Sequence, residues 1–164
     1  MPAIKPLILP TRVFETAMNF KLGDLDLKFI ETDIHSDDAS VLWIEKSGIL
    51  LAGDTMEDTI TYVGEPQDFD IHLKDLDHLW ALSPNHILPN HGAPEVIAAG
   101  GYTKSFIRAQ QQYIRMLKRC RDDATLRETP LRQLISGPLE AGWIHYFAPY
   151  EEVHKQNLDR IMKI

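Results

Sequence analysis

Alternating apolar and polar positions mark the first regular element of the chain. From Leu22, apolar residues at 25, 27 and 29 face one way, and charged residues at 24, 26 and 28 face the other. A period of two predicts a half-buried strand. The apolar runs 41–44 and 49–52, joined by a turn at 46–48, predict two more strands. The second run is continuously apolar, which predicts burial on both of its faces.

Helical spacing takes over after residue 70. Apolar side chains at 73, 76, 79 and 80 predict a helix over 73–82, and a short strand at 87–88 ends at Pro89. A longer amphipathic helix is expected over 103–121. Thr129 and Pro130 form a typical helix opening, with Thr129 as the cap of a helix over 131–135. The last helix is expected over 149–162. Strands and helices alternate, so the fold class is α/β or layered α+β.

The chain shows no internal repeat, low-complexity tract or linker. Its 164 residues suit one domain, 1–164, or a large part of a bigger one. Residues 1–20 are apolar and contain three prolines, so we interpret them as a connecting or edge segment.

Composition narrows the range of partners. The net charge is −7, which argues against sequence-independent nucleic-acid binding, because that needs a basic surface. Cys120 is the one cysteine, so no internal disulfide forms, and a reducing cytoplasm fits. No apolar run reaches the roughly 18 residues of a membrane span. We therefore expect a cytoplasmic protein with a small-molecule substrate and without a nucleic-acid or membrane partner.

Three polar residues stand just beyond the ends of apolar strands. His35 follows the first strand, Asp54 directly follows the 49–52 run and Gly53, and His91 follows Leu88, Pro89 and Asn90. Loops at strand ends are common positions for active-site residues, because the sheet holds them in place. Imidazole and carboxylate together suit zinc, iron or manganese. The pattern indicates a candidate metal site.

These segments resemble a known family. His-Ser-Asp-Asp-Ala at 35–39, Leu-Leu-Ala-Gly-Asp at 50–54 and Leu-Pro-Asn-His-Gly at 88–92 resemble the third, fourth and fifth motifs of the metallo-β-lactamase fold. The resemblance covers roughly residues 21–164, including a closing helix around 150–158. It implies half of an αββα sandwich, with a mixed sheet and helices on one face. It also implies that His35 binds the first metal, Asp54 bridges two metals and takes part in catalysis, and His91 binds the second.

The resemblance implies metal-assisted hydrolysis of an ester, thioester, amide or phosphodiester, with a dinuclear centre of zinc, or alternatively iron or manganese, in the complete domain. The family's His-x-His-x-Asp-His motif is absent here, because no two of the histidines are separated by one residue; they stand at 35, 72, 78, 86, 91, 145 and 154. Zinc sites normally use three or four protein donors, so the chain alone should bind metal weakly or not at all. We expect it to be inactive by itself, and to self-associate or to bind an N-terminal half-domain over an exposed apolar face.

Two alternatives stay open at this stage. The chain could be a degenerate, non-catalytic member that acts as a dimerisation or interaction module. It could also be a small α/β binding domain in which the three polar residues are coincidental. Asp37 and Asp38 could orient the ring of His35 by hydrogen bonding, or they could be solvated carboxylates of the loop. The other expected roles are structural. His72 and His78 are expected on a polar helix face, and His154 in the last helix is expected to bond to a neighbouring loop. Packing or helix-end positions are expected for His86, Cys120, Trp43 and Trp80.

Overall fold

The computed structural model describes residues 9–164 and contains one five-stranded sheet in the order β1-β2-β3-β4-β5. The first four strands pair antiparallel, and β5 runs parallel to β4, so the sheet is mixed. The strands are β1 Ala17–Leu22, β2 Leu25–Glu31, β3 Ser40–Ile44, β4 Ile49–Gly53 and β5 His86–Pro89. The edge strand β1 begins within residues 1–20, which we expected to be a connecting or edge segment. Residues 1–8 of that segment lie outside the described part.

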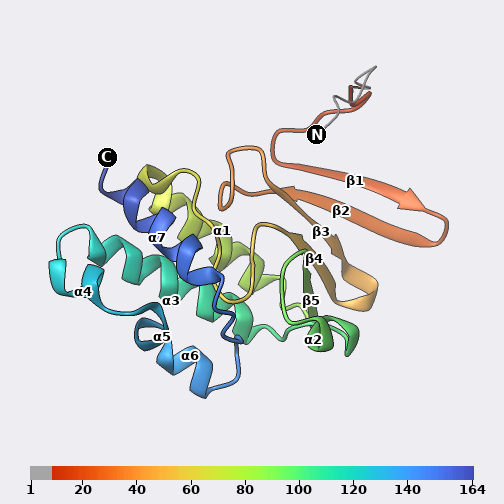
Figure 1. The fold of residues 1–164 in the computed structure, drawn as a ribbon. Coiled ribbons are helices and arrows are strands. Elements are labelled where there is room, and N and C mark those ends of the chain that lie inside the picture. The colour runs from red at the N-terminus through yellow and green to blue at the C-terminus, as the bar shows by residue number, and fades with distance from the viewer. Residues whose placement is uncertain (1–8) are drawn as a thin grey trace, which may run out of the picture.

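The main helices α1, α3 and α7 lie together on one side of the sheet (Figure 1). None of the helices in residues 9–164 combines the length and hydrophobicity needed to cross a bilayer. The helices are α1 Phe69–Ala81, α2 Pro94–Ala98, α3 Ser105–Cys120, α4 Ala124–Glu128, α5 Leu131–Leu134, α6 Ser136–Glu140 and α7 Tyr150–Ile161, with short 3₁₀ turns η1 Glu45–Ser47 and η2 Pro66–Asp68. This layered α/β arrangement is the fold class expected from the sequence.

The capping role predicted for Thr129 is wrong. Its side chain donates to the carbonyl of Thr125 at 2.7 Å, which closes the end of α4. Pro130 stands at the start of α5 without a side-chain cap. The short helix α4 was not expected, and Asp123 caps it by accepting from the backbone N–H groups of Thr125 and Leu126. The residue before a proline is steered toward extended backbone, so Thr129 ends one helix rather than opening the next.

The two faces of the sheet differ. On the helix side, Trp43, Leu50 and Ile87 lie opposite one another in register and are buried. On the other side, a row of apolar side chains crosses all five strands: Met18, Phe29, Leu42, Leu51 and Leu88. Leu51 is 36% exposed. The predicted burial of β4 on both faces is therefore wrong within this chain. We call this second side the open face.

Strand direction explains where the polar strand-end residues meet. β2 and β4 both run antiparallel to β3, and β5 is parallel to β4. The carboxyl ends of β2, β4 and β5 therefore lie at the same edge of the sheet. The residues that follow these strands are the loop with His35, Asp54, and the loop with His91. The fold thus brings three segments, widely separated in sequence, to one edge.

Candidate functional site

Asp54 and His91 form one pair at this edge. His91 Nε2 lies 3.5 Å from Asp54 Oδ1, and the backbone N–H of Asn90 donates to the carbonyl of Gly53 at 2.9 Å. Gly53 has φ of 55°, a left-handed conformation that favours glycine, and it turns the chain at the end of β4. The Gly-Asp sequence therefore places Asp54 against the loop that follows β5.

His35 forms a second pair, with a residue that sequence reasoning missed. His35 Nδ1 lies 3.4 Å from Glu57 Oε1, and the other Glu57 oxygen accepts from the Tyr150 hydroxyl at 2.8 Å. The contact with Glu57 is the main cause that raises the pKa of His35, against desolvation that lowers it; the charge of Asp54 also raises it. Thr32 and Thr55 hydroxyls meet at 3.0 Å and join the loops that carry His35 and Asp54.

A buried segment, residues 55–63, connects these pairs to the helices. It carries Glu57 and Asp58, which are 6% and 4% exposed. Gln110 of α3 accepts from the backbone N–H of Thr61 and donates to the carbonyl of Glu57. Asn157 of α7 accepts from Val63 N–H and donates to the carbonyl of Thr61. Two buried amides therefore fix the backbone on which the acidic pair stands.

Asp58 belongs to a third arrangement at the same edge. Its Oδ1 accepts from the backbone N–H of His145 at 2.8 Å. Its Oδ2 accepts from the Tyr102 hydroxyl at 2.7 Å and lies 3.0 Å from His145 Nδ1. Burial raises the pKa of Asp58, and the hydrogen bonds from Tyr102 and His145 oppose that shift. The backbone N–H of Asp58 also donates to the carbonyl of His91 at 3.1 Å, so this network adjoins the predicted site.

Gly92 is required by the same network. A Cβ atom on Gly92 would lie 2.7 Å from the Tyr102 hydroxyl oxygen. That hydroxyl accepts from the backbone N–H of Ala93 at 2.8 Å while it donates to Asp58. The His-Gly pair of the sequence therefore has a packing reason, because only glycine leaves room for this tyrosine.

Two histidines differ from their expected positions. His72 does not lie on a polar face of α1; it is fully buried. α1 begins at Phe69, and the residues buried along it are Phe69, His72, Leu76 and Leu79. His154 is buried too, and its Nδ1 lies 3.0 Å from the hydroxyl of Tyr113 on α3, rather than contacting a loop. Desolvation lowers the pKa of both histidines. Cys120 is buried as expected.

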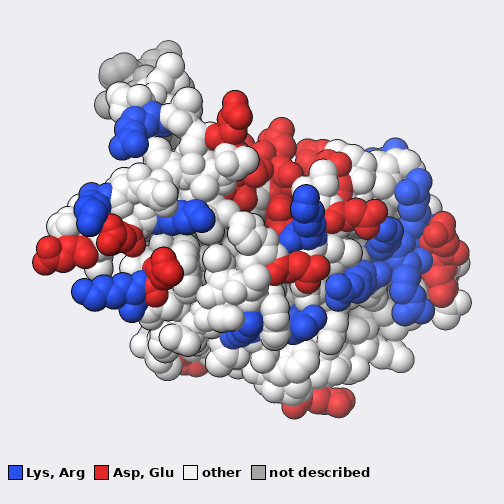
Figure 2. Space-filling model, turned by 180° about the vertical axis from the view of Figure 1, so that it is seen from behind, with Lys and Arg blue, Asp and Glu red and all other residues white. Residues whose placement is uncertain are grey.

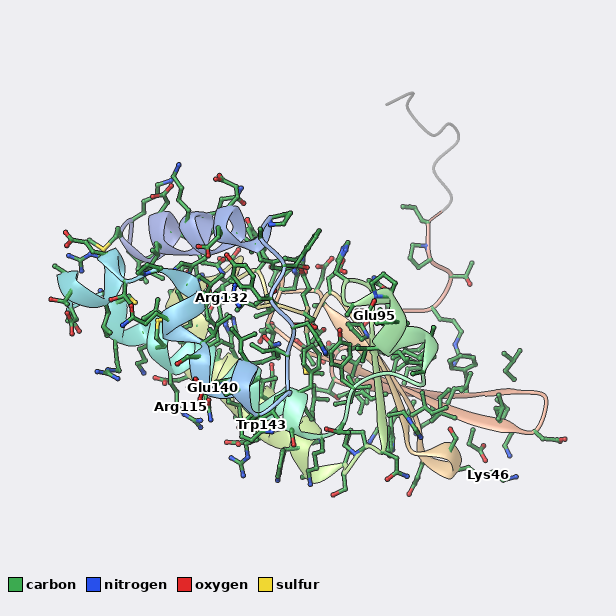
Figure 3. The ribbon with its side chains drawn as sticks, turned by 60° about the horizontal axis from the view of Figure 1, so that its bottom comes forward. Lys46, Glu95, Arg115, Arg132, Glu140 and Trp143 are labelled. Atoms are coloured by element: carbon green, nitrogen blue, oxygen red, sulfur yellow. The ribbon has the colours of Figure 1, made fainter. Side chains whose placement is uncertain are left out.

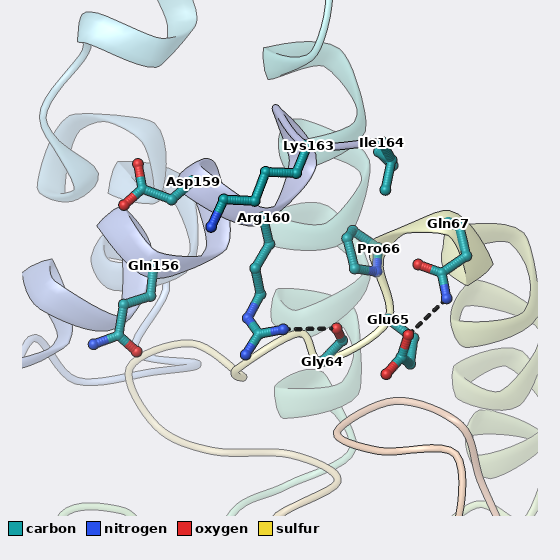
Figure 4. A pocket seen from close by; sticks show the side chains of 9 residues that line it. All are labelled: Gly64, Glu65, Pro66, Gln67, Gln156, Asp159, Arg160, Lys163 and Ile164. Atoms are coloured by element: carbon teal, nitrogen blue, oxygen red, sulfur yellow. Dashed lines mark hydrogen bonds between the residues drawn. The ribbon is translucent and has the colours of Figure 1, made fainter.

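Two cavities bear on function. One of about 450 Å³ adjoins the candidate site and is lined by Asp58, Asn90, His91, Gly92, Ala93, Pro94, Glu95, His145, Tyr146, Phe147 and Tyr150. Another, of about 520 Å³, lies between η2 and the end of α7 and has no strand-end residue in its lining (Figure 4). There Arg160 donates to the Gly64 carbonyl, and Gln67 donates to Glu65. Its mixed charges do not converge on one ligand chemistry, so position favours the first cavity.

The donors suit a metal in kind but not in number. Asp54 Oδ1 is a buried atom without a hydrogen-bond partner among the residues described, as expected of a group that a cation would satisfy. Within residues 9–164, however, no three His, Cys, Asp or Glu side chains gather closely enough to hold an ion. The structure therefore shows two donor pairs at one edge and no complete set of ligands.

Comparison with known proteins addresses the fold. The sequence matches no protein-family model and no curated protein. Among solved structures, a β-lactamase domain protein from Burkholderia ambifaria is 22% identical with a TM-score of 0.55, and covers 96% of this chain and 46% of its own. A metallo-β-lactamase family protein from Thermus thermophilus is 18% identical with a TM-score of 0.52, and covers 90% of this chain and 48% of its own.

The chain has the metallo-β-lactamase fold. It spans about half the length of the two structures, and its mixed sheet with helices corresponds to half of the metallo-β-lactamase sandwich. The resemblance of the three sequence motifs is thus confirmed at the level of the fold. Metal binding and hydrolysis by this chain stay proposals.

Proposed function

We propose that the chain supplies one half of a metal-dependent hydrolase site of the metallo-β-lactamase type. His35, Asp54 and His91 are the proposed ligands, zinc is the proposed metal, with iron or manganese as alternatives, and Asp54 is the proposed bridging residue in a dinuclear complete domain. The observation that carries the proposal is the His91–Asp54 pair at 3.5 Å, with His35 in another loop at the same edge, where three strands end. When bound, the metal would lower the pKa of a bound water and supply hydroxide for hydrolysis.

The residues of this chain position the ligands. Glu57 stands against Nδ1 of His35, an arrangement that orients the ring and leaves Nε2 for a ligand role. Because the three ligands are shared between two metals, each metal has only two of the three or four protein donors of a tight zinc site. We therefore expect the chain alone to be inactive and to bind metal weakly. The missing donors would come from an N-terminal half-domain or from another copy of the chain.

A second candidate function has its own support. The open face presents apolar side chains across five strands, and Leu22, Leu25 and Leu51 are 64%, 42% and 36% exposed. Such a face suits a protein partner. The alternative is therefore a non-catalytic module that uses this face for dimerisation or interaction.

Cobalt(II) titration of the whole chain separates the candidates. Cobalt in a site of histidine and carboxylate ligands absorbs visible light, and the intensity depends on coordination geometry. We expect saturable binding with a dissociation constant weaker than about 1 μM, since complete structural sites bind far more tightly. His91→Ala and Asp54→Asn should each weaken it about tenfold or more. His78→Asn, at an exposed position on α1, is the matched control.

Binding that is unaffected by both ligand substitutions, or no binding at millimolar cobalt, would contradict the hydrolase proposal for this chain. The second result would leave the interaction module as the better account. Because the assay reads metal coordination rather than turnover, it does not require the substrate to be known.

A further inference from the structure

The cavity beside the candidate site contains a histidine that is held from one side only. His145 follows α6 and precedes α7, and its side chain is 47% exposed, whereas the Asp58 side chain beneath it is 1% exposed. Nδ1 of the ring lies 3.0 Å from Asp58 Oδ2. The opposite edge of the ring, with Nε2, is the part that remains for the cavity that His145 lines.

The surrounding donors favour one tautomer of the ring. Ala93 N–H donates to the Tyr102 hydroxyl, so that hydroxyl donates onward to Asp58 Oδ2. The backbone N–H of His145 donates to Oδ1. Each oxygen of Asp58 thus accepts a hydrogen bond, which suits a carboxylate. A carboxylate can only accept from Nδ1, and in that tautomer Nε2 presents its lone pair to the cavity.

The other lining residues define the class of ligand. The side chains of Ala93, Pro94, Tyr146, Phe147 and Tyr150 supply apolar or aromatic surface, and Phe147 is 59% exposed. The lining has two acidic residues and neither lysine nor arginine.

Cations gather elsewhere in the molecule. α3 carries Arg108, Arg115, Lys118 and Arg119 and no acidic residue. Figure 2 shows Lys and Arg clustered toward one end of the back face, and in Figure 3 Arg115 lies well away from Glu95. Arg132 lies nearer, because its guanidinium stacks over the ring of Tyr146 at 5.0 Å from the ring centroid. An anionic group therefore finds no lysine or arginine in the lining itself.

We propose that this cavity binds a neutral molecule with an aromatic or apolar body and a hydrogen-bond donor, and that His145 Nε2 accepts that hydrogen bond. Asp58 is the positioning residue that fixes the ring.

The test uses the whole ¹⁵N-labelled chain with a chelator, so that no metal contributes. The probes are 2-phenylacetamide, which is neutral and has N–H donors, and phenyl phosphate, which has a similar ring and is anionic. We expect saturable NMR shifts around His145 and Phe147 with phenylacetamide at a dissociation constant of about 1 mM, and binding about tenfold weaker for phenyl phosphate. Imidazole ¹⁵N shifts should place the proton of the neutral His145 tautomer on Nδ1.

The deciding variant is His145→Asn. Its amide replaces Nδ1 as donor to Asp58 but removes the cavity-facing acceptor, so a purely structural role predicts unchanged binding. We expect phenylacetamide to bind about tenfold more weakly, whereas the exposed control His78→Asn binds normally. Equal or stronger phosphate binding, no saturable shift, unchanged binding by His145→Asn, or a proton on Nε2 would each overturn the proposal.

The tautomer measurement needs no variant and stands if His145→Asn fails to fold. Cobalt binding and phenylacetamide binding are independent readouts. Loss of the first with retention of the second would remove the hydrolase and keep the ligand site.

Discussion

His72 shows what burial does to a single titratable side chain. It is fully buried in α1, and neither ring nitrogen makes a hydrogen bond of ordinary geometry among the described residues, although a contact with the Asp33 backbone weakly opposes the lowering of its pKa. A buried polar group without a partner costs about 1–3 kcal/mol. We therefore expect His72→Leu to raise the free energy of unfolding at pH 7 by about 1–2 kcal/mol. Urea denaturation of both proteins measures this, and a less stable variant would show that the ring has a partner after all.

The same substitution should change the pH dependence of stability. Burial lowers the pKa of His72 below its ordinary value of 6.5. The unfolded chain then binds a proton that the folded chain does not, so stability is fully present above pH 6.5 and is lost as pH falls toward the folded pKa. The stability gain from His72→Leu should thus grow between pH 7 and pH 5. Groups unchanged by the substitution, such as His154, cancel in the comparison. A constant difference would contradict the shift.

At this scale the sequence predicts which residues share one edge of the sheet, where that location follows from their position beside a strand. His35, Asp54 and His91 come to one edge because their strands end there. Glu57 was missed because its partner Tyr150 lies 93 residues further along the chain. The His145–Asp58 contact likewise spans 87 residues. The local sequence pattern does not predict contacts between residues so far apart in the chain. The role of a buried acidic residue can be inferred only when the structure shows which groups donate hydrogen bonds to it.

At the scale of elements, α7 supports residues 55–63, the segment that carries Glu57 and Asp58. Asn157 is completely buried and connects α7 to Val63, Thr61 and the Tyr113 hydroxyl through three hydrogen bonds of 2.9–3.0 Å. The helix itself was predictable from its spacing. Its function as a clamp on residues 55–63 was not, because that depends on which residue of the helix faces the segment.

Replacing Asn157 with alanine should release this segment. Three hydrogen bonds are lost and a buried N–H and carbonyl are left without partners, so we expect a loss of about 3 kcal/mol in the free energy of unfolding. Gln156→Ala, at the neighbouring exposed position, should change it by less than about 0.5 kcal/mol. Hydrogen exchange should show faster opening at Thr61 and Val63. Equal stability of the two variants would mean that the clamp contributes little.

On the scale of the whole molecule, the sheet has one face buried by helices and one open. The pattern of β4 predicted burial on both faces, and the chain satisfies only one of them, with Leu50 buried and Leu51 exposed. The apolar residues of a strand match all the surfaces that it contacts when the protein functions. Those surfaces can include ones that another half-domain or another copy provides. The incorrect prediction for β4 therefore supports a partner over the open face.

Charge placed on the open face should prevent association. We expect the chain to self-associate with increasing concentration in sedimentation velocity, because the open face loses contact with water when two copies meet. Burying one leucine contributes about 1.5–3 kcal/mol, so Leu51→Lys should weaken the association at least about tenfold. Ile71→Lys is the matched control, since Ile71 is 42% exposed on α1, away from the sheet. If the unmodified chain stays monomeric at high concentration, the open face does not bind a second copy, and a half-domain of another sequence becomes the partner to seek.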